Sequence, residues 1–178
     1  MSYTDFGLTI VKDYPIKGIN FIDINGLLAK PACFTKAIDT FCHIISTTLT
    51  PIPAKTAVIS PESRGFLFGA PVAHQLGLPL LAIRKKGKIP NNPYPFHITN
   101  EYTSYDMEVD GDLLQDFAQF IYIDDILATG QTLAAVKQAL ETKGKKILLA
   151  VHLTAVADLK AVRDNNPALK DLPVKEVI

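Results

Sequence analysis

Residues 121–132 read IYIDDILATGQT, and this stretch decides the fold. An apolar run leads directly into two acids, Asp124 and Asp125, and small and hydroxylated residues then open a helical pattern. The unpaired N–H groups at the start of a helix suit a phosphate, and adjacent carboxylates can accept hydrogen bonds from a vicinal diol. Taken singly, these residues are typical of any strand-to-helix turn. Together they predict a phosphate-binding turn between a buried strand at 120–123 and a helix at 132–141.

Apolar strands and helical patterns alternate along much of the chain. Strands are predicted at 56–60, 78–83 and 147–153, and helices at 31–49 and 65–75. This alternation predicts an α/β fold with a largely parallel sheet flanked by helices on both faces. In such sheets ligands bind beyond the carboxyl ends of the strands, which is where the two acids lie.

Residues 84–100 show a different pattern. They carry arginine, lysine, glycine, proline and asparagine without an apolar period, and they begin with the run RKKGKIP at 84–90, here called the basic segment. We interpret 84–100 as a long mobile loop, followed by an extended stretch at 101–109. A charge run is usually a solvated face, but this one follows a strand end, where cations can meet a polyanion.

The composition limits the class of protein. A chain of 178 residues predicts one domain. Its 18 basic and 18 acidic residues balance, and this argues against the strongly basic field on which general nucleic-acid binding rests. The sequence has two cysteines, no signal-peptide pattern and no apolar run of membrane-spanning length, so we expect a cytoplasmic protein without membrane contact.

The stretch at 121–132 resembles the motif with which type I phosphoribosyltransferases bind phosphoribosyl pyrophosphate (PRPP). The resemblance extends from about residue 14 to about residue 159 and is greatest to the adenine-using members. It implies that Asp124 and Asp125 face the ribose hydroxyls. It also implies that the 5′-phosphate is wrapped by Ala128, Thr129, Gly130, Gln131 and Thr132. Gln131 stands where adenine-using members usually have a second glycine, which leaves the loop less freedom.

Two further stretches resemble the parts of the family that hold pyrophosphate. PESRGFLFG at 61–69 implies that Ser63 and Arg64 bind it, and a planar guanidinium suits phosphate oxygens. The resemblance also gives Arg64 a catalytic role, in stabilising the leaving polyanion. In the basic segment it places Arg84, Lys85 and Lys88 near the pyrophosphate.

The family's closing loop and base site have weaker counterparts. Glu101 matches the residue that accepts a proton from the base or stabilises it by a hydrogen bond. Residues 18–24, GINFIDI, resemble the N-terminal hood over the purine, so 1–30 is predicted to form a hood within the single domain. The base-binding residues implied are Asn20, Phe21, Ile22 and Ile126, of which Asn20 and Ile22 depart from the family pattern.

The resemblance implies a homodimeric purine-salvage enzyme that converts adenine and PRPP to AMP and pyrophosphate. Mg²⁺ is the expected cofactor, held by the substrate and water with no direct protein ligand. Asn20 keeps open a transferase for hypoxanthine, guanine or xanthine. A regulator that binds PRPP without chemistry is a second alternative, although such proteins often lose the pyrophosphate loop or the closing glutamate, and both are present here.

Overall fold

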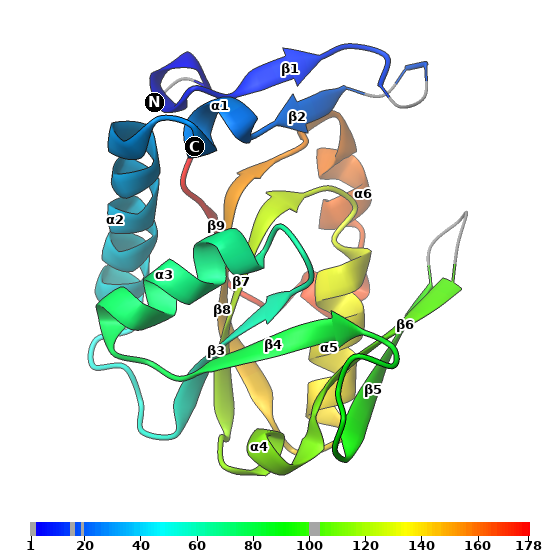
Figure 1. Ribbon diagram of the computed structural model, residues 1–178. Coiled ribbons are helices and arrows are strands. Elements are labelled where there is room, and N and C mark those ends of the chain that lie inside the picture. Colours follow the sequence, from blue (N-terminus) through cyan, green and yellow to red (C-terminus); the bar gives the residue numbers. More distant parts are fainter. Residues whose placement is uncertain (1–2, 15–16, 19, 100–103) are drawn as a thin grey trace.

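The computed structural model describes residues 3–14, 17–18, 20–99 and 104–178, and its centre is one seven-stranded sheet (Figure 1). The strand order is β5-β6-β4-β3-β7-β8-β9. The pairs β3–β4, β3–β7, β7–β8 and β8–β9 are parallel, while β4–β6 and β5–β6 are antiparallel, so the predicted largely parallel sheet is confirmed. The strands are β3 (Thr56–Pro61), β4 (Leu80–Lys85), β5 (Pro93–Thr99), β6 (Ser104–Asp110), β7 (Gln119–Leu127), β8 (Lys146–Ala155) and β9 (Val174–Glu176).

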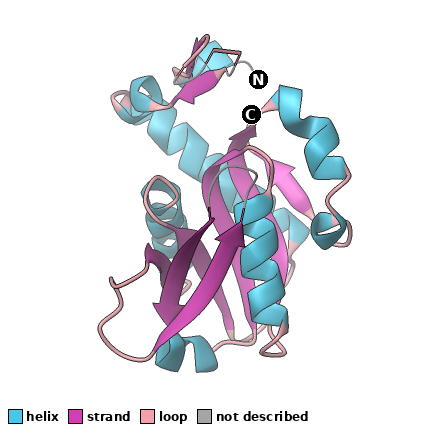
Figure 2. Cartoon of the chain, turned by 90° about the vertical axis from the view of Figure 1, so that its right-hand side faces the viewer, coloured by secondary structure: helices cyan, strands magenta, loops and turns pink. Residues whose placement is uncertain are grey.

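Helices cover both faces of this sheet (Figures 1 and 2). Alternate residues of β7 point to opposite faces: Tyr122 packs in the core beneath α5, whereas Ile121 and Ile123 pack in the core beneath α2 and α3. The main helices are α2 (Pro31–Thr48), α3 (Phe66–Leu76) and α5 (Gln131–Glu141). Shorter ones are α1 (Asn25–Leu28), α4 (Gly111–Gln115), α6 (Lys160–Asp164) and the 3-10 turns η1 (Tyr3–Phe6), η2 (Ala157–Leu159) and η3 (Pro167–Leu169).

A small second sheet lies near the N-terminus. Strands β1 (Thr9–Val11) and β2 (Phe21–Asp23) pair antiparallel and lie above the carboxyl ends of β7 and β8 (Figure 1). We call this pair the N-terminal sheet. Its place fits the predicted hood, and its role over a base stays a prediction. In the described part of the chain, no helix combines the length and the apolar character needed to cross a membrane.

The predicted mobile loop at 84–100 is wrong for residues 84–85, which end β4, and for residues 93–99, which form β5. Its apolar period was hidden by prolines: Tyr94, Phe96 and Ile98 face α5, while Pro93 and Pro95 alternate with them on the exposed side. Proline has no N–H to give to a sheet, but an edge strand tolerates it, and β5 is the edge of this sheet.

Strand β7 also runs further than the sequence predicts. It continues through both acids to Leu127, because β8 continues beside it and pairs Asp124 with His152 and Ile126 with Thr154. The two carboxylates are therefore held by a sheet ladder on a rigid strand, and only 128–130 form the turn before α5.

Candidate active site

Two cavities meet at the carboxyl ends of β3 and β7. The larger has a volume of about 840 Å³, and its wall includes Ser63, Arg64, Lys85, Asp124 and Asp125. The smaller has a volume of about 80 Å³, and its wall includes residues 128–132 at the start of α5. Asp124, Ile126 and Thr132 line both cavities, so a ligand with two anionic ends could place one in each.

The smaller cavity lies at the N-terminus of α5. Residues 128–132, here called the phosphate loop, all line it. Gly130 ends the turn with φ +78°, and a Cβ added there would lie 2.6 Å from Leu169 Cδ1 of η3. Glycine is therefore required twice, for its backbone conformation and for the close approach of Leu169. The helix begins at Gln131, so its first N–H groups and the positive end of its dipole suit an anion in this cavity.

Arg163 forms hydrogen bonds with the backbone at the start of the phosphate loop. Arg163 Nη1 of α6 donates to the carbonyl of Ala128 at 2.8 Å and to that of Val156 at 2.6 Å, and lies 3.4 Å from the carbonyl oxygen of Leu127. Its stem also lies beside Gly130, with Cγ 3.9 Å from where a Cβ would be. The guanidinium thus links the end of β7 to the end of β8 and fixes the start of the loop.

Asp124 is held at both of its carboxylate oxygens. The hydroxyl of Tyr122 donates to Oδ2 at 3.0 Å, and the N–H of Asp125 donates to Oδ1 at 2.9 Å. Desolvation by the surrounding protein, and then the charge of Asp125, raise the pKa of Asp124 well above its usual range. Each oxygen retains a lone pair, so a hydroxyl in either cavity can still donate to it.

Asp125 instead meets a charged partner. Arg64 Nε lies 2.7 Å from Asp125 Oδ2, and the guanidinium carbon of Arg64 lies 5.6 Å from the centre of the Phe21 ring of the N-terminal sheet. The arginine side chain is 42% exposed and faces the larger cavity, whereas that of Asp125 is 6% exposed. Gly65 lets the turn after β3 lie close to Asp124, because a Cβ there would lie 2.9 Å from Asp124 Oδ1 and 2.7 Å from the Pro61 carbonyl oxygen.

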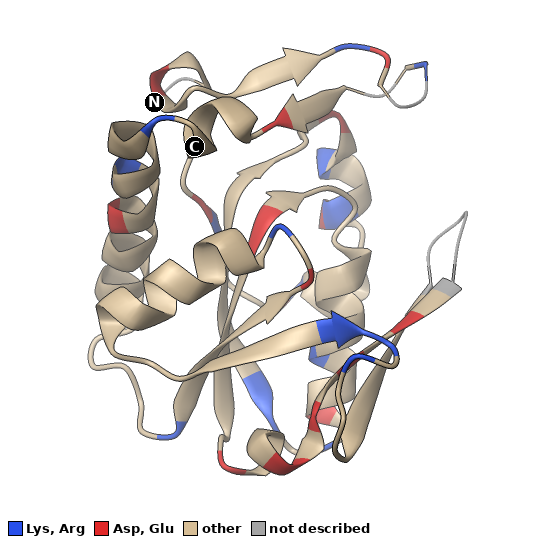
Figure 3. Ribbon diagram, in the orientation of Figure 1, with Lys and Arg blue, Asp and Glu red and all other residues tan. Residues whose placement is uncertain are grey.

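Acidic side chains form hydrogen bonds with the basic segment, and Figure 3 marks where acidic and basic residues lie along the ribbon. Glu62 Oε2 accepts from Arg84 Nε and from the N–H of Lys85, both at 3.0 Å. These hydrogen bonds, that from Lys85 first, lower the pKa of Glu62. Glu108 Oε1 accepts from the N–H of Lys88 at 2.7 Å. Of the three predicted pyrophosphate residues in this segment, only Lys85 lines the larger cavity; Arg84 faces Glu62, and Lys88 lies outside the cavity wall.

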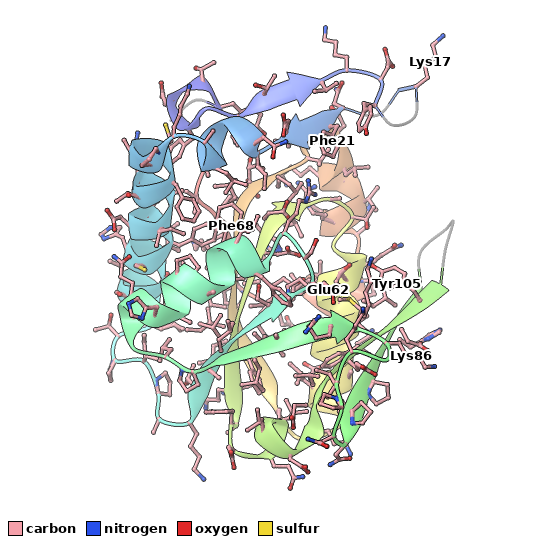
Figure 4. The ribbon with its side chains drawn as sticks, viewed as in Figure 1. Lys17, Phe21, Glu62, Phe68, Lys86 and Tyr105 are labelled. Carbon is pink, nitrogen blue, oxygen red and sulfur yellow. The ribbon has the colours of Figure 1, made fainter. Side chains whose placement is uncertain are left out.

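Lys86, to which the sequence assigned no role, also lines the larger cavity. Its Nζ lies 2.8 Å from Asp106 Oδ2, and the other oxygen of Asp106 lies 2.6 Å from His97 Nδ1. The hydrogen bonds from Lys86 and then His97 lower the pKa of Asp106. Figure 4 shows Glu62, Lys86 and Tyr105 on one side of the molecule, below Phe21. Two of the cations that line the larger cavity, Arg64 and Lys86, are thus already paired with acids.

The predicted base-binding residues are distributed unevenly. Ile126 lines both cavities, and half-buried Phe21 reaches the site through its contact with Arg64. The side chain of Ile22 is buried in the core beneath α2 and α3. Asn20 is exposed, and its Nδ2 donates to Asp158 Oδ2 at 3.3 Å. Glu101, the predicted proton acceptor, lies outside the described residues.

Known proteins share this sequence and fold over most of their length. Residues 27–172 match the family described as Phosphoribosyl transferase domain. The chain is 36% identical over 174 residues to the adenine phosphoribosyltransferase of Treponema denticola, which covers 98% of this chain and 87% of that protein. The chain belongs to the adenine phosphoribosyltransferase family. The adenine phosphoribosyltransferase of Roseiflexus castenholzii is 42% identical over 147 residues, covering 81% of this chain and 83% of the relative.

Solved structures of adenine phosphoribosyltransferases superimpose on the whole chain. The Saccharomyces cerevisiae enzyme, in complex with an imino-altritol bisphosphate and adenine, has a TM-score of 0.83 at 27% identity and covers 98% of this chain and 96% of its own. The Giardia lamblia enzyme, in complex with 9-deazaadenine, has a TM-score of 0.78 at 30% identity and covers 100% of this chain and 97% of its own. The expected family and the type I phosphoribosyltransferase fold are therefore confirmed.

Some site residues of this adenine phosphoribosyltransferase family member escaped the sequence prediction. Tyr122 could have been found, because a residue two positions before Asp124 on a strand shares its face. Glu62 stands next to predicted Ser63, whereas Asp106 lies on β6, and the pairing of both acids across strands depends on the register. Arg163 carries no sequence signal, since it lies far downstream of the loop that it holds.

Proposed function

We propose that this chain transfers the 5-phosphoribosyl group of PRPP to adenine and releases AMP and pyrophosphate, a purine-salvage reaction. The observation that carries the proposal is the pair of cavities joined at Asp124. PRPP has a phosphate at one end of a ribose and a pyrophosphate at the other. The small cavity suits the first, the larger one suits the second, and the carboxylates lie at the junction.

The phosphate loop would hold the 5′-phosphate through backbone N–H groups and the hydroxyls of Thr129 and Thr132. With that end fixed, Asp124 and Asp125 would accept hydrogen bonds from the ribose hydroxyls. A ribose held at both places cannot rotate, and this orients C1 for attack. The main contribution of this half of the site is orientation, because neither carboxylate needs to exchange a proton.

Ser63, Arg64, Lys85 and Lys86 would surround the leaving pyrophosphate. The bond from C1 to the pyrophosphate oxygen breaks, that oxygen keeps the electron pair, and a nitrogen of adenine forms the new bond to C1. Preorganised positive charge stabilises the group that becomes more negative in this step. Ion pairs with Asp125 and Asp106 keep two of the surrounding cations, Arg64 and Lys86, in place before the substrate arrives.

Mg²⁺ would enter with the substrate. Within the described residues no group of three His, Cys, Asp or Glu side chains is arranged to hold a metal ion. A metal bound mostly by phosphate oxygens and water fits such a site, since Mg²⁺ keeps several waters and commonly takes substrate phosphates as ligands. Bound there, it would neutralise part of the pyrophosphate charge. The Mg²⁺ requirement stays a prediction that chelation with EDTA tests.

Adenine would lie between the N-terminal sheet and Ile126, with Glu101 taking the proton of its attacking nitrogen, as the resemblance implies. The amide nitrogen of Asn20 is engaged with Asp158, so we assign Asn20 no direct contact with the base. We also expect a homodimer, which light scattering of the purified protein would measure.

The test is a set of incubations with PRPP, Mg²⁺ and one base at a time: adenine, hypoxanthine, guanine or xanthine. Nucleotide is separated by chromatography, and pyrophosphate is measured by coupled phosphate release. We expect AMP to form far faster than the other nucleotides. Faster formation of another nucleotide would keep the chemistry and overturn the base, while tight PRPP binding without any product would replace the enzyme with a regulator.

A further inference from the structure

Tyr122 is buried in the core of the protein, yet its polar end points toward the active site. It lies in the middle of β7, and its side chain is completely buried among the apolar residues beneath α5. A buried phenol needs a hydrogen-bond partner, because an unpaired hydroxyl in an apolar core is costly. The partner here is Asp124 Oδ2, at 3.0 Å. If apolar packing alone determined the residue at this position, phenylalanine would serve as well, because the hydroxyl adds no apolar contact.

The ring of Tyr122 packs against a second ring. His152 of β8 packs against it, with 5.7 Å between ring centres and 42° between ring planes. Strand pairing sets this contact, because His152 is the β8 partner of Asp124. Burial, and then the charge of Arg163, lower the pKa of His152 to about 3, so the imidazole is neutral and does not compete as a cation for Asp124.

Asp124 is the charged residue that lines both cavities, so we expect its orientation to affect both ends of the substrate. A strand-borne aspartate can still turn about its side-chain bonds. The N–H of Asp125 holds Oδ1 and Tyr122 holds Oδ2, and these two directions together define the plane of the carboxylate. Without the phenol, only the N–H of Asp125 would hold the group.

We propose that Tyr122 is a positioning residue for the ribose of PRPP, acting through Asp124. This role rests on the proposed function, in which Asp124 accepts hydrogen bonds from the ribose. The hydroxyl keeps the carboxylate turned toward the junction of the cavities and donates to its charged form. Although Tyr122 also lines the smaller cavity, its hydroxyl is engaged by Asp124, so we assign its effect to the orientation of that carboxylate.

The hydroxyl should also affect how the site titrates. A donor to the carboxylate favours ionisation, so removing it raises the already raised pKa of Asp124 further. PRPP binding that needs the carboxylate is lost as the pH falls through that pKa, and the acid limb therefore moves to higher pH in the variant. The other charged or titratable groups around this pair are Asp125 on the same strand, Tyr105 of β6, His152 of β8, Arg64 through Asp125, and Arg163 through His152.

The test is Tyr122→Phe, which removes one oxygen atom. The matched control is Tyr94→Phe, because the Tyr94 hydroxyl donates to the Ala139 carbonyl at 3.0 Å, outside both cavities. We expect Tyr122→Phe to weaken PRPP binding by calorimetry roughly tenfold, the effect of losing one hydrogen bond to a charged group. The KM for adenine should not change, and the acid limb of kcat/KM for PRPP should move to higher pH. Tyr94→Phe should alter Tm alone.

Unchanged PRPP affinity and an unchanged acid limb in Tyr122→Phe, with a Tm shift like that of Tyr94→Phe, would overturn the positioning role. Failure of the unmodified protein to make AMP would instead remove the proposed function, and calorimetry with PRPP alone would still test the role. If Tyr122→Phe does not fold, 3-fluorotyrosine at position 122 replaces it. This more acidic phenol is a stronger donor and should move the acid limb to lower pH, and no movement would contradict the proposal.

Discussion

The phosphate loop and the basic segment both contribute residues to the walls of the two cavities, but the protein holds them differently. The phosphate loop is fixed by packing and by bonds to its backbone: Leu169 fills the space beside Gly130, and Arg163 donates to the carbonyl of Ala128. The basic segment is held by carboxylates, with Glu62 on Arg84 and Asp106 on Lys86. The backbone N–H donors of the phosphate loop stay open to a phosphate. In the basic segment, Arg84 and Lys86 would have to give up their ion pairs with carboxylates to bind pyrophosphate.

This difference suggests a division of work. A loop fixed by packing costs little to order when the ligand binds, so it should set affinity for the constant part of the substrate. Cations in ion pairs with carboxylates add less to affinity, because each gives up a partner as it gains one. Arg64 stands between the two cases, since it is paired with Asp125 yet its side chain is 42% exposed to the larger cavity.

The largest expected effect belongs to Arg64. Arg64→Ala removes the charge that faces the leaving pyrophosphate, and we expect kcat to fall about 100- to 1,000-fold, as for the loss of one preorganised donor. The free energy of unfolding should change by about 1 kcal/mol or less, because the side chain is partly exposed. Steady-state kinetics and urea unfolding measure the two quantities. Arg84→Ala is the comparison, and we expect a smaller loss of kcat because Arg84 is paired with Glu62. An equal loss of kcat in the two variants would contradict this distinction between the arginines.

The next effect tests the packed loop. Gly130→Ala places a methyl group against Leu169 at a positive φ, so we expect the KM for PRPP to rise about tenfold to a hundredfold, from overpacking of roughly 1–3 kcal/mol. Gly144→Ala is the control, because Gly144 also has a positive φ, +68°, but has open space where its Cβ would be. A similar KM in both variants would mean that the contact with Leu169 does not shape the loop.

A smaller effect should come from Arg163, which forms hydrogen bonds with the backbone of the phosphate loop. Arg163→Met keeps most of the stem and removes every donor, and we expect the KM for PRPP to rise about threefold to tenfold as the backbone of Ala128 loosens. The KM for adenine should not change. Lys160→Met is the control, because its ion pair with Asp164 lies on the same helix but is exposed. If the two variants bind PRPP equally well, Arg163 does not fix the phosphate loop.

The smallest effect concerns the ion pairs of the basic segment. Asp106→Asn removes an anion from the wall of the larger cavity and releases Lys86, so the KM for PRPP should fall about twofold to fivefold, the value of one exposed ion pair. Lysine and histidine hold the pKa of Asp106 below its usual range, so the wild-type carboxylate stays ionised at every ordinary assay pH.

Salt should reduce this gain, because exposed charges are screened. Asp164→Asn, the same change of charge in α6, should leave the KM unchanged. A KM for PRPP that rises in Asp106→Asn would show that the aspartate positions Lys86 rather than competing for it.

What the sequence could predict follows the same division. The smaller cavity could be predicted from the sequence because most of its lining residues lie in one short stretch, from Tyr122 to Leu133. The residues that hold the phosphate loop could not be predicted, because Arg163 and Leu169 contact it only through the path that the chain takes after β8. The basic segment was predicted as a set of free cations, and its carboxylate partners come from β6 and from the loop after β3. The sequence shows which residues are charged, but predicting their ion pairs requires knowing which strands are neighbours.

The error at 84–100 has the same physical origin. Tyr94, Phe96 and Ile98 alternate correctly for a strand, but the prolines between them read as loop residues until the strand is known to be an edge. Asn20 and Ile22 were assigned to a base from the resemblance alone. Their side chains point instead to Asp158 and to the core, which their positions in the sequence could not indicate.

The prolines of β5 have a consequence for how copies of this chain can meet. An open strand edge is a template on which another chain can add a strand. Pro93 and Pro95 can lie in an edge strand only with their nitrogens away from its partner, so that rim of the sheet lacks two of its donors and carries two rings instead. Both losses disfavour strand addition at this rim. We therefore expect a dimer of this protein to use other surfaces and not to extend the sheet through β5.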